Sequence, residues 1–153
     1  MVNTFLPWPD SQKTARLLDN KRLGKQRVEA LQILKVNLGL TKGWKNHPAA
    51  VMWRGSEGML VVYIYDMCDE WTRRGYADTV RATTYELVQE HGITIGGQPW
   101  WWGNKEFHQS HRSNLVRKDP DHYRFRINPN LPYKWPTPEG NLRITNTNIR
   151  KNN

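Results

Sequence analysis

Hydrophobic residues recur at helical spacing along most of this chain. Between residues 20 and 38, apolar side chains return every three or four positions, and Gly39 follows where a helix commonly ends. A second apolar stripe runs through residues 56–74 and stops at Gly75. Its members are Leu60, Tyr63, Ile64, Met67 and Trp71. The pattern predicts two long helices, of which the one over residues 56–74 is central and mostly buried, with Ser56 as its N-terminal cap.

Four shorter segments also carry helical signals. Asp10 or Ser11 can cap a first helix, whose apolar positions are Ala15, Leu17 and Leu18. Further helices are predicted over residues 48–53, 78–91 and 104–118. Residues 93–103 contain three consecutive tryptophans and predict either a short strand or a loop.

The region beyond Tyr123 is rich in proline and asparagine, which favours an extended strap over a helix. Within that strap, Tyr133 and Trp135 are predicted to pack onto the helical body. We therefore predict an all-α (mainly α) fold with one compact helical domain over residues 1–136. An extended or partly disordered C-terminal tail is expected over residues 137–153.

Positive charge is the strongest feature of the composition. Lysine and arginine number 23 against 14 aspartates and glutamates, which gives a formal net charge of +9. Such an excess in one small domain usually indicates a phosphate-bearing partner, most often nucleic acid. The chain also has eight tryptophans, and exposed aromatic rings on a basic surface suit stacking on bases.

The cysteine content and the N-terminal residues indicate a compartment. Cys68 is the only cysteine, which excludes an intramolecular disulfide and a zinc site built on cysteines. The N-terminal residues lack the features of a signal peptide, and no segment has the length of a membrane span. We expect a soluble cytoplasmic protein without a membrane partner.

One carboxylate, Glu29, lies among bases on the helix predicted over residues 20–38. Arg22, Lys25 and Glu29 are spaced by three and four residues, so they share a helix face beside the apolar stripe. Composition alone favours a solvated acid that forms ordinary ion pairs. The alternative is a general acid–base residue whose pKa is tuned by neighbouring cations and by partial burial. Both interpretations stay open at this point.

Basic residues form three clusters that could line one groove. In chain order the clusters are Lys13, Arg16, Lys21, Arg22, Lys25 and Arg27; Trp44, Lys45 and Arg54; and Arg112, Arg117 and Lys118. Phosphate contacts from such clusters would make binding strongly dependent on salt.

The five histidines do not complete a recognisable metal site. His108 and His111 are spaced so that one helix could present both imidazoles to one ion, but no HExxH pattern or carboxylate pair accompanies them. We therefore expect no metal. The chain also lacks a P-loop, a GxSxG motif and a Cys/His pair at catalytic spacing, which excludes most common enzyme classes.

Four segments, taken in order, resemble one known family. They are LDNKRLGKQRVEAL, TKGWKNHPAAVMWRG, EWTRRGYADT and FHQSHRSNLVRKDPDHY. The resemblance covers about residues 3–136. The family is the phage endonuclease V family of pyrimidine-dimer DNA glycosylases, and the similarity is greatest to a branch of bacterial and phage proteins grouped with it.

The resemblance implies a compact all-helical DNA-repair enzyme without metal or cofactor. In that family an N-terminal α-amine attacks the sugar of the damaged nucleotide, a helix glutamate assists, and a Schiff base forms before the strand is nicked. Glu29 matches the position of that glutamate, and Val2 would supply the amine after removal of Met1. Val28 stands where the family has an arginine, although Arg27 is adjacent.

The first hypothesis is therefore an N-glycosylase, with or without AP-lyase activity, that acts as a monomer on a damaged or modified pyrimidine in double-stranded DNA. Its predicted catalytic residues are Val2 and Glu29. Trp44 and His47 are candidates for contact with a flipped base or a kinked duplex. The other predicted DNA contacts are Arg22, Lys25, Arg27, Lys45, Arg54, His111, Arg112, Arg117 and Lys118.

Two further hypotheses use the same composition. A binding module that recognises distorted or modified duplex DNA would need the basic face, but neither Glu29 nor a free N-terminus. A protein that folds around its tryptophans and binds acidic partners would not bind duplex DNA even at low salt.

Overall fold

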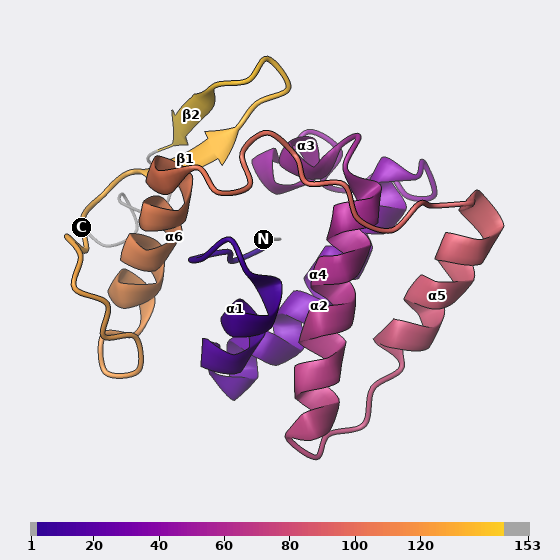
Figure 1. Ribbon diagram of the computed structural model, residues 1–153, viewed down its shortest axis with the longest axis horizontal. Helices are drawn as coiled ribbons and strands as arrows, with labels where there is room; N and C mark the ends of the chain where they lie inside the picture. Colours follow the sequence, from indigo (N-terminus) through magenta and orange to yellow (C-terminus); the bar gives the residue numbers. More distant parts are fainter. Residues whose placement is uncertain (1–2, 146–153) are drawn as a thin grey trace.

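The computed structural model describes residues 3–145; residues 1–2 and 146–153 lie outside the described part, and with them the predicted nucleophile Val2. Helices make up most of the structure (Figure 1), and the predicted mainly α fold is confirmed. The elements are α1 (Ser11–Leu17), α2 (Asn20–Asn37), α3 (Pro48–Trp53), α4 (Glu57–Arg73), α5 (Val80–His91), α6 (Lys105–Lys118), β1 (Tyr133–Pro136) and β2 (Leu142–Thr145). Within residues 3–145, no helix combines the length and apolar character needed to cross a bilayer.

Helix α4 is the centre of the helical body. It packs against α1, α2 and α5, and Figure 1 shows it running alongside α2, with α5 beside it. Leu60, Tyr63, Ile64 and Met67 of its predicted stripe are fully buried, and Trp71 is half-buried. The prediction of a central, mostly buried helix is therefore confirmed.

Two helix starts differ in part from the sequence pattern. Ser56 is the N-cap residue of α4, as predicted, but its side chain makes no capping hydrogen bond, and the Glu57 carboxylate accepts the N–H of Gly55 before the helix at 2.6 Å. Helix α5 begins at Val80 and not at residue 78. The Asp78 carboxylate accepts backbone N–H groups at the start of that helix, so Asp78 is a capping residue.

The segment between α5 and α6 crosses the start of α4 as a loop (Figure 1). A Cβ atom at Gly58 would lie 2.0 Å from the carbonyl oxygen of Thr94, so only glycine permits this approach. The Gly96 N–H then donates to the Gly58 carbonyl oxygen at 3.1 Å. Of the two interpretations left open for residues 93–103, the loop is the correct one.

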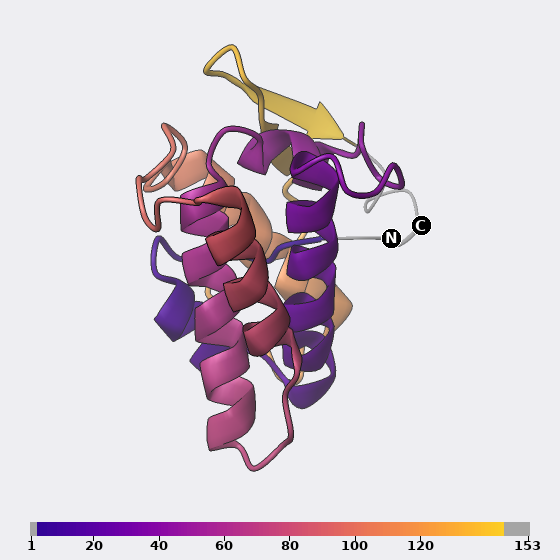
Figure 2. The ribbon, with the colours of Figure 1, turned by 90° about the vertical axis from the view of Figure 1, so that its right-hand side faces the viewer.

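The strands β1 and β2 form an antiparallel hairpin. β1 packs against α3 and α6, and Figure 2 shows the hairpin covering one end of the helical body. Tyr133 and Trp135 are buried, which confirms their predicted packing. Residues 142–145, predicted as part of an extended tail, pair with β1 as a strand, and residues 146–153 of that tail lie outside the described residues.

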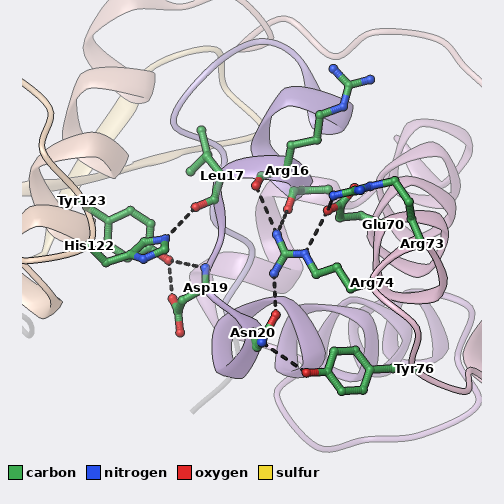
Figure 3. A network of polar contacts seen from close by, with 11 residues as sticks. Arg16, Leu17, Asp19, Asn20, Glu70, Arg73, Arg74, Tyr76, His122 and Tyr123 are labelled. Carbon is green, nitrogen blue, oxygen red and sulfur yellow. Dashed lines mark hydrogen bonds and ion pairs between the residues drawn. The ribbon is translucent and has the colours of Figure 1, made fainter.

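Arg74, just after α4, connects three helices (Figure 3). Its Nε donates to Oε2 of Glu70 at 2.8 Å, and its Nη1 donates to Oδ1 of Asn20 at 2.8 Å. Its Nη2 donates to the carbonyl oxygens of Ala15 and Arg16, each at 3.1 Å. Carbonyls in the last turn of a helix have no partner within the helix. The Arg74 guanidinium supplies partners for two of these carbonyls in α1, and it also bonds the first residue of α2.

Replacement of Arg74 by alanine is expected to lower the free energy of unfolding by about 3 kcal/mol, because it removes a half-buried guanidinium that bonds Glu70 and also connects α4 to Asn20 and to the end of α1. Hydrogen bonds from Arg73 and Arg74 lower the pKa of Glu70 to about 2. Arg73→Ala is the matched control. Arg73 donates to the same carboxylate, but its side chain is 68% exposed, so its replacement should lower the free energy of unfolding much less. Urea denaturation at pH 7 measures both variants, and equal losses would contradict the role given to Arg74.

Candidate functional site

Residues 3–8 enter the molecule as an extended segment between α6 and the α2–α4 pair (Figure 1). Because this segment is part of neither helix nor sheet, its buried backbone groups depend on side chains for hydrogen bonds. The Phe5 N–H donates to Oε1 of the buried Gln26 on α2 at 2.8 Å. The Tyr63 hydroxyl on α4 lies 2.8 Å from the Phe5 carbonyl oxygen, so two helices fix this one residue.

Two buried histidines of α6 hold the next residue, Leu6. The Leu6 N–H donates to Nδ1 of His111 at 2.9 Å, and Nδ1 of His108 lies 2.8 Å from the Leu6 carbonyl oxygen. Nε2 of His108 accepts the Gly103 N–H at 3.0 Å, so Nδ1 is the nitrogen that carries the proton and donates to Leu6. Burial lowers the pKa of both imidazoles, and that of His111 lies well below its ordinary range. Both rings are therefore neutral at pH 7.

This arrangement corrects one predicted DNA contact. His111 is fully buried, and its ring packs against Phe107 and Tyr133. It is a core residue and cannot reach DNA. The spacing of His108 and His111 serves to clamp a backbone, and no group of three or more His, Cys, Asp or Glu among residues 3–145 could hold a metal ion.

Arg112 and Trp8 hold the far end of the segment. Nη1 of Arg112 donates to the Pro7 carbonyl oxygen at 2.7 Å, and its guanidinium lies 4.2 Å from the centroid of the Trp8 ring. The ammonium of Lys13 lies 4.1 Å from the centroid of the same ring. Arg112, predicted as a DNA contact, thus anchors the chain.

These anchors bring the start of the described chain to Glu29. The Asn3 side chain exchanges hydrogen bonds of 2.8 and 3.0 Å with the hydroxyl of the buried Tyr133. Asn3 and Glu29 line the same cavity. The Asn3 backbone N–H is near enough to the Glu29 carboxylate to favour its ionised form.

Glu29 is half-buried on α2. Burial raises its pKa above the ordinary value of 4.5, and Lys25, the Asn3 N–H and Lys118 offset part of that rise. A carboxyl group with a raised pKa is protonated more readily near neutral pH than an exposed one. This property suits a group that both accepts and donates protons.

A cavity of about 190 Å³ opens beside Glu29, and we call it the cationic pocket. It is lined by Asn3, Phe5, Lys21, Arg22, Lys25, Glu29 and Lys118. Its four basic side chains come from α2 and from the last residue of α6. Arg22 is also paired with Asp19 at 3.1 Å, which holds its guanidinium in place. The pocket therefore attracts anions around one half-buried carboxyl group.

A larger cavity of about 700 Å³ adjoins the first, and we call it the tryptophan groove. It shares Lys21, Lys25 and Glu29 with the cationic pocket. Its other lining residues are Asn20, Gly24, Val28, Gln32, Trp44 and Trp71. Glu29 thus lies at the boundary between a cationic cavity and a more apolar one.

Only part of the predicted DNA-contact set converges on Glu29. Arg22, Lys25 and Lys118 line the cationic pocket, and Trp44 lines the tryptophan groove. Lys21 lines both cavities but was absent from the predicted site. Its spacing of four residues from Lys25 on one helix could have identified it. Asn3 carried no such signal, because its position depends on contacts with distant residues.

Arg27 and Arg117 are occupied elsewhere. Arg27 forms an ion pair with Asp78, and its side chain is only 12% exposed. Arg117 donates to the carbonyl oxygens of Pro129 and Leu131 at 2.7 and 2.9 Å, and so holds the strap that leads to β1. Neither residue belongs to the lining of the two cavities.

The remaining candidates belong to the loop before α3 and to the end of that helix. Lys45 and Arg54 are exposed outside both linings, and Arg54 donates to the Lys45 carbonyl oxygen at 2.6 Å. His47 caps α3, because its Nδ1 accepts a backbone N–H of the first turn at 3.0 Å. Its ring lies edge-to-face with Trp44 at a centroid distance of 5.7 Å, and burial lowers its pKa. His47 therefore supports the position of Trp44.

Comparison with known proteins gives one match. A family model described as pyrimidine dimer DNA glycosylase matches residues 2–84, which is more than half of the 153 residues. The matched part contains the segment at residues 3–8, helices α1 to α4 and the start of α5. No curated protein and no solved structure matches the chain significantly.

The stability of the fold is expected to decrease as the pH falls below about 6.5. The unfolded chain would protonate His108 and His111 near their ordinary pKa, whereas burial keeps both neutral in the folded chain. Each such group contributes a slope of about 1.4 kcal/mol per pH unit where only the unfolded chain binds the proton. His111→Phe removes one of these protons, so its stability should depend less on pH. Urea denaturation at pH 7, 6 and 5 measures the slopes, and an unchanged slope in His111→Phe would contradict the assignment.

Proposed function

Because the chain belongs to the pyrimidine dimer DNA glycosylase family, we propose that it releases a damaged or modified pyrimidine from duplex DNA. In this proposal Glu29 is the acid–base residue, the Val2 α-amine is the nucleophile, and the protein acts as a monomer. The family supports a DNA glycosylase that acts in DNA repair. The residues and the steps that follow are our proposal.

The shared cavity of Asn3 and Glu29, with its four basic side chains, carries this proposal. The Val2 nitrogen is joined to the Asn3 nitrogen through two backbone atoms, so covalent geometry limits their separation to about 4 Å. Because Asn3 lines the same cavity as Glu29, a Val2 amine freed by removal of Met1 would be covalently tied to a residue of that cavity.

In the first step, the neutral Val2 amine attacks C1′ of the damaged nucleotide. An α-amine has a pKa near 8, so a useful fraction is unprotonated at neutral pH. The bond from nitrogen to C1′ forms as the bond from C1′ to the base breaks, and the base leaves with the bonding electrons. Ionised Glu29 stabilises the positive charge that develops on the sugar and takes the proton from the new ammonium group.

The same two groups can complete a lyase step. Protonated Glu29 donates to O4′ as the sugar ring opens, which leaves a protonated imine between the Val2 nitrogen and C1′ and an ionised Glu29. The carboxylate then removes a proton from C2′, the bond from C3′ to its oxygen breaks, and the 3′ phosphate departs. Water hydrolyses the imine and restores the amine. The raised pKa of Glu29 suits a group that alternates between its two forms.

The cationic pocket would hold the phosphates that flank the reacting sugar. Arg22, Lys25 and Lys118 line it together with Lys21. The exposed Lys45 and Arg54 would extend the contact along the duplex. Binding through such contacts should weaken steeply as the salt concentration rises.

A non-catalytic module for distorted or modified duplex DNA is the second candidate function. The basic cationic pocket and the exposed Trp44 would serve it equally well. Such a module requires neither a titratable Glu29 nor a free amine. The two experiments that follow therefore separate it from the enzyme.

Glu29→Gln is expected to slow cleavage of the glycosidic bond by about 100-fold or more, the usual contribution of a positioned acid–base group. Cleavage in the wild-type protein should increase with pH as Glu29 ionises, over a range above the ordinary glutamate value of 4.5. The assay is single-turnover cleavage of a labelled duplex with one pyrimidine dimer. Glu90→Gln, on the exposed face of α5, is the control. Equal rates for Glu29→Gln and wild type would remove Glu29 from the mechanism.

Borohydride is expected to trap a covalent adduct between the protein and an abasic duplex, through reduction of the imine. Digestion and mass spectrometry should locate the adduct at the Val2 nitrogen, and a protein that retains an N-terminal tag should form none. An adduct at Lys21, Lys25 or Lys118 would exclude Val2 as the nucleophile. If no adduct forms with a native N-terminus, the lyase step is wrong. The Glu29→Gln assay then tests whether the protein still cleaves the glycosidic bond without a lyase step.

A further inference from the structure

We propose that Tyr133 is a positioning residue for the nucleophile. Its hydroxyl holds the side chain of Asn3 and thereby fixes where the Val2 α-amine lies relative to Glu29. This inference rests on the proposed function and adds to it a residue of β1, outside residues 2–84 that the family model matches. Tyr133 is only 1% exposed, so it acts through Asn3 and not by contact with DNA.

One hydroxyl bonds both polar atoms of the Asn3 side chain. Nδ2 of Asn3 donates to the Tyr133 oxygen at 2.8 Å, and the hydroxyl lies 3.0 Å from Oδ1 of Asn3 as a donor. The same Oδ1 accepts the Thr4 N–H at 2.7 Å, which ties the side chain to the backbone of the next residue. The extended segment thus has a side-chain anchor at its first described residue, ahead of the backbone anchors at Phe5 and Leu6.

The Tyr133 ring is itself held in place by α6 and by β1. His111 of α6 meets the ring edge-to-face at a centroid distance of 4.8 Å, and Trp135 stacks on it at 4.6 Å. The Lys134 N–H donates to Oγ of Ser110 at 3.2 Å, which fastens this part of β1 to α6. The hydroxyl therefore has a defined position before DNA binds, as is required of a group that preorganises a site.

The Tyr133 hydroxyl also lies near the carboxylate that the amine must work with. Burial raises the pKa of Tyr133, and the negative charge of Glu29 adds to the rise. The hydroxyl therefore stays protonated at the pH of a cleavage assay and keeps the proton that it donates to Asn3.

The covalent chain transmits the position of Asn3 to the amine. Asn3 and Glu29 line the same cationic pocket. One peptide bond joins Asn3 to Val2, so a shift of Asn3 would carry the amine with it. The cost of such a shift would fall on the attack at C1′, because the phosphate contacts in the pocket come from other side chains.

The test removes the hydroxyl and its partner separately. Tyr133→Phe keeps the aromatic ring, and Asn3→Ala removes the group that the hydroxyl holds. The assay is single-turnover formation of the borohydride-trapped adduct on a saturating abasic duplex. Tyr133→Phe should form the adduct about 10-fold to 100-fold more slowly, the usual cost of a small displacement of a reacting group. The Kd for the same duplex should stay at its wild-type value.

A double variant shows whether Tyr133 acts through Asn3. If it does, the two losses are not additive, and Asn3→Ala with Tyr133→Phe should be no slower than Asn3→Ala alone. Tyr65→Phe is the matched control and should react at the wild-type rate. The Tyr65 hydroxyl is buried without a hydrogen-bond partner among residues 3–145, and Tyr65 lies outside the cationic pocket. Urea denaturation of each variant gives the folded fraction to which every rate is normalised.

Three results would overturn the inference and leave the proposed function in place, because the wild-type protein forms the adduct in each. The first is a wild-type rate in Tyr133→Phe. The second is an additive loss in the double variant. The third is a weaker affinity or a smaller folded fraction that accounts for the whole loss of rate, which would make the role of Tyr133 purely structural.

Failure of the proposed nucleophile would give a different result. A wild-type protein with a native N-terminus that forms no adduct contradicts the Val2 amine as nucleophile, and this inference falls with it. Hydrogen exchange would then identify the bond as a structural one. In Tyr133→Phe the Thr4 N–H, which donates to Asn3, should exchange faster, whereas the Phe5 N–H, held by Gln26, should not.

Discussion

The fold depends on the hydrogen bonds that side chains make to the backbone of residues 5–7. This segment crosses the interior outside any sheet, so its N–H and C=O groups would be costly to bury without partners. Side chains from three helices supply the partners: Gln26 of α2, Tyr63 of α4, and His108, His111 and Arg112 of α6. These bonds connect α6 to the α2–α4 pair and also fix the direction in which the chain reaches Glu29. Folding and assembly of the site therefore use the same hydrogen bonds.

The basic residues divide into two groups with different physical roles. Arg27, Arg74 and Arg117 are half-buried and bind acids or carbonyl oxygens, as suits a planar group with several donors. Lys21 and Lys25 line the cavities around Glu29 and are exposed. The net charge of a chain therefore overestimates the number of basic residues that are free to bind a nucleic acid, because some of these residues stabilise the fold.

The sequence predicted the helices well, because helical periodicity depends on spacing within one element. Helical periodicity identifies α2 and α4, and the resemblance selects Glu29 among the acids. The sequence could not show that Arg22 lines the cationic pocket whereas Arg27, on the same helix, is held in an ion pair. That difference depends on Asp78, which is distant in sequence. His111 was misassigned for the same reason, because its partner Leu6 is 105 residues away.

The second half of the chain contributes to a site whose family match ends at residue 84. Lys118 lines the cationic pocket, and Tyr133 holds the side chain of Asn3. His108 and His111 fix Leu6, three residues further along the segment. A fragment that ends at residue 84 would lose these contacts and leave the start of the chain without most of its anchors. The matched region thus supplies Glu29, and the remainder of the chain holds Asn3 in the same cavity.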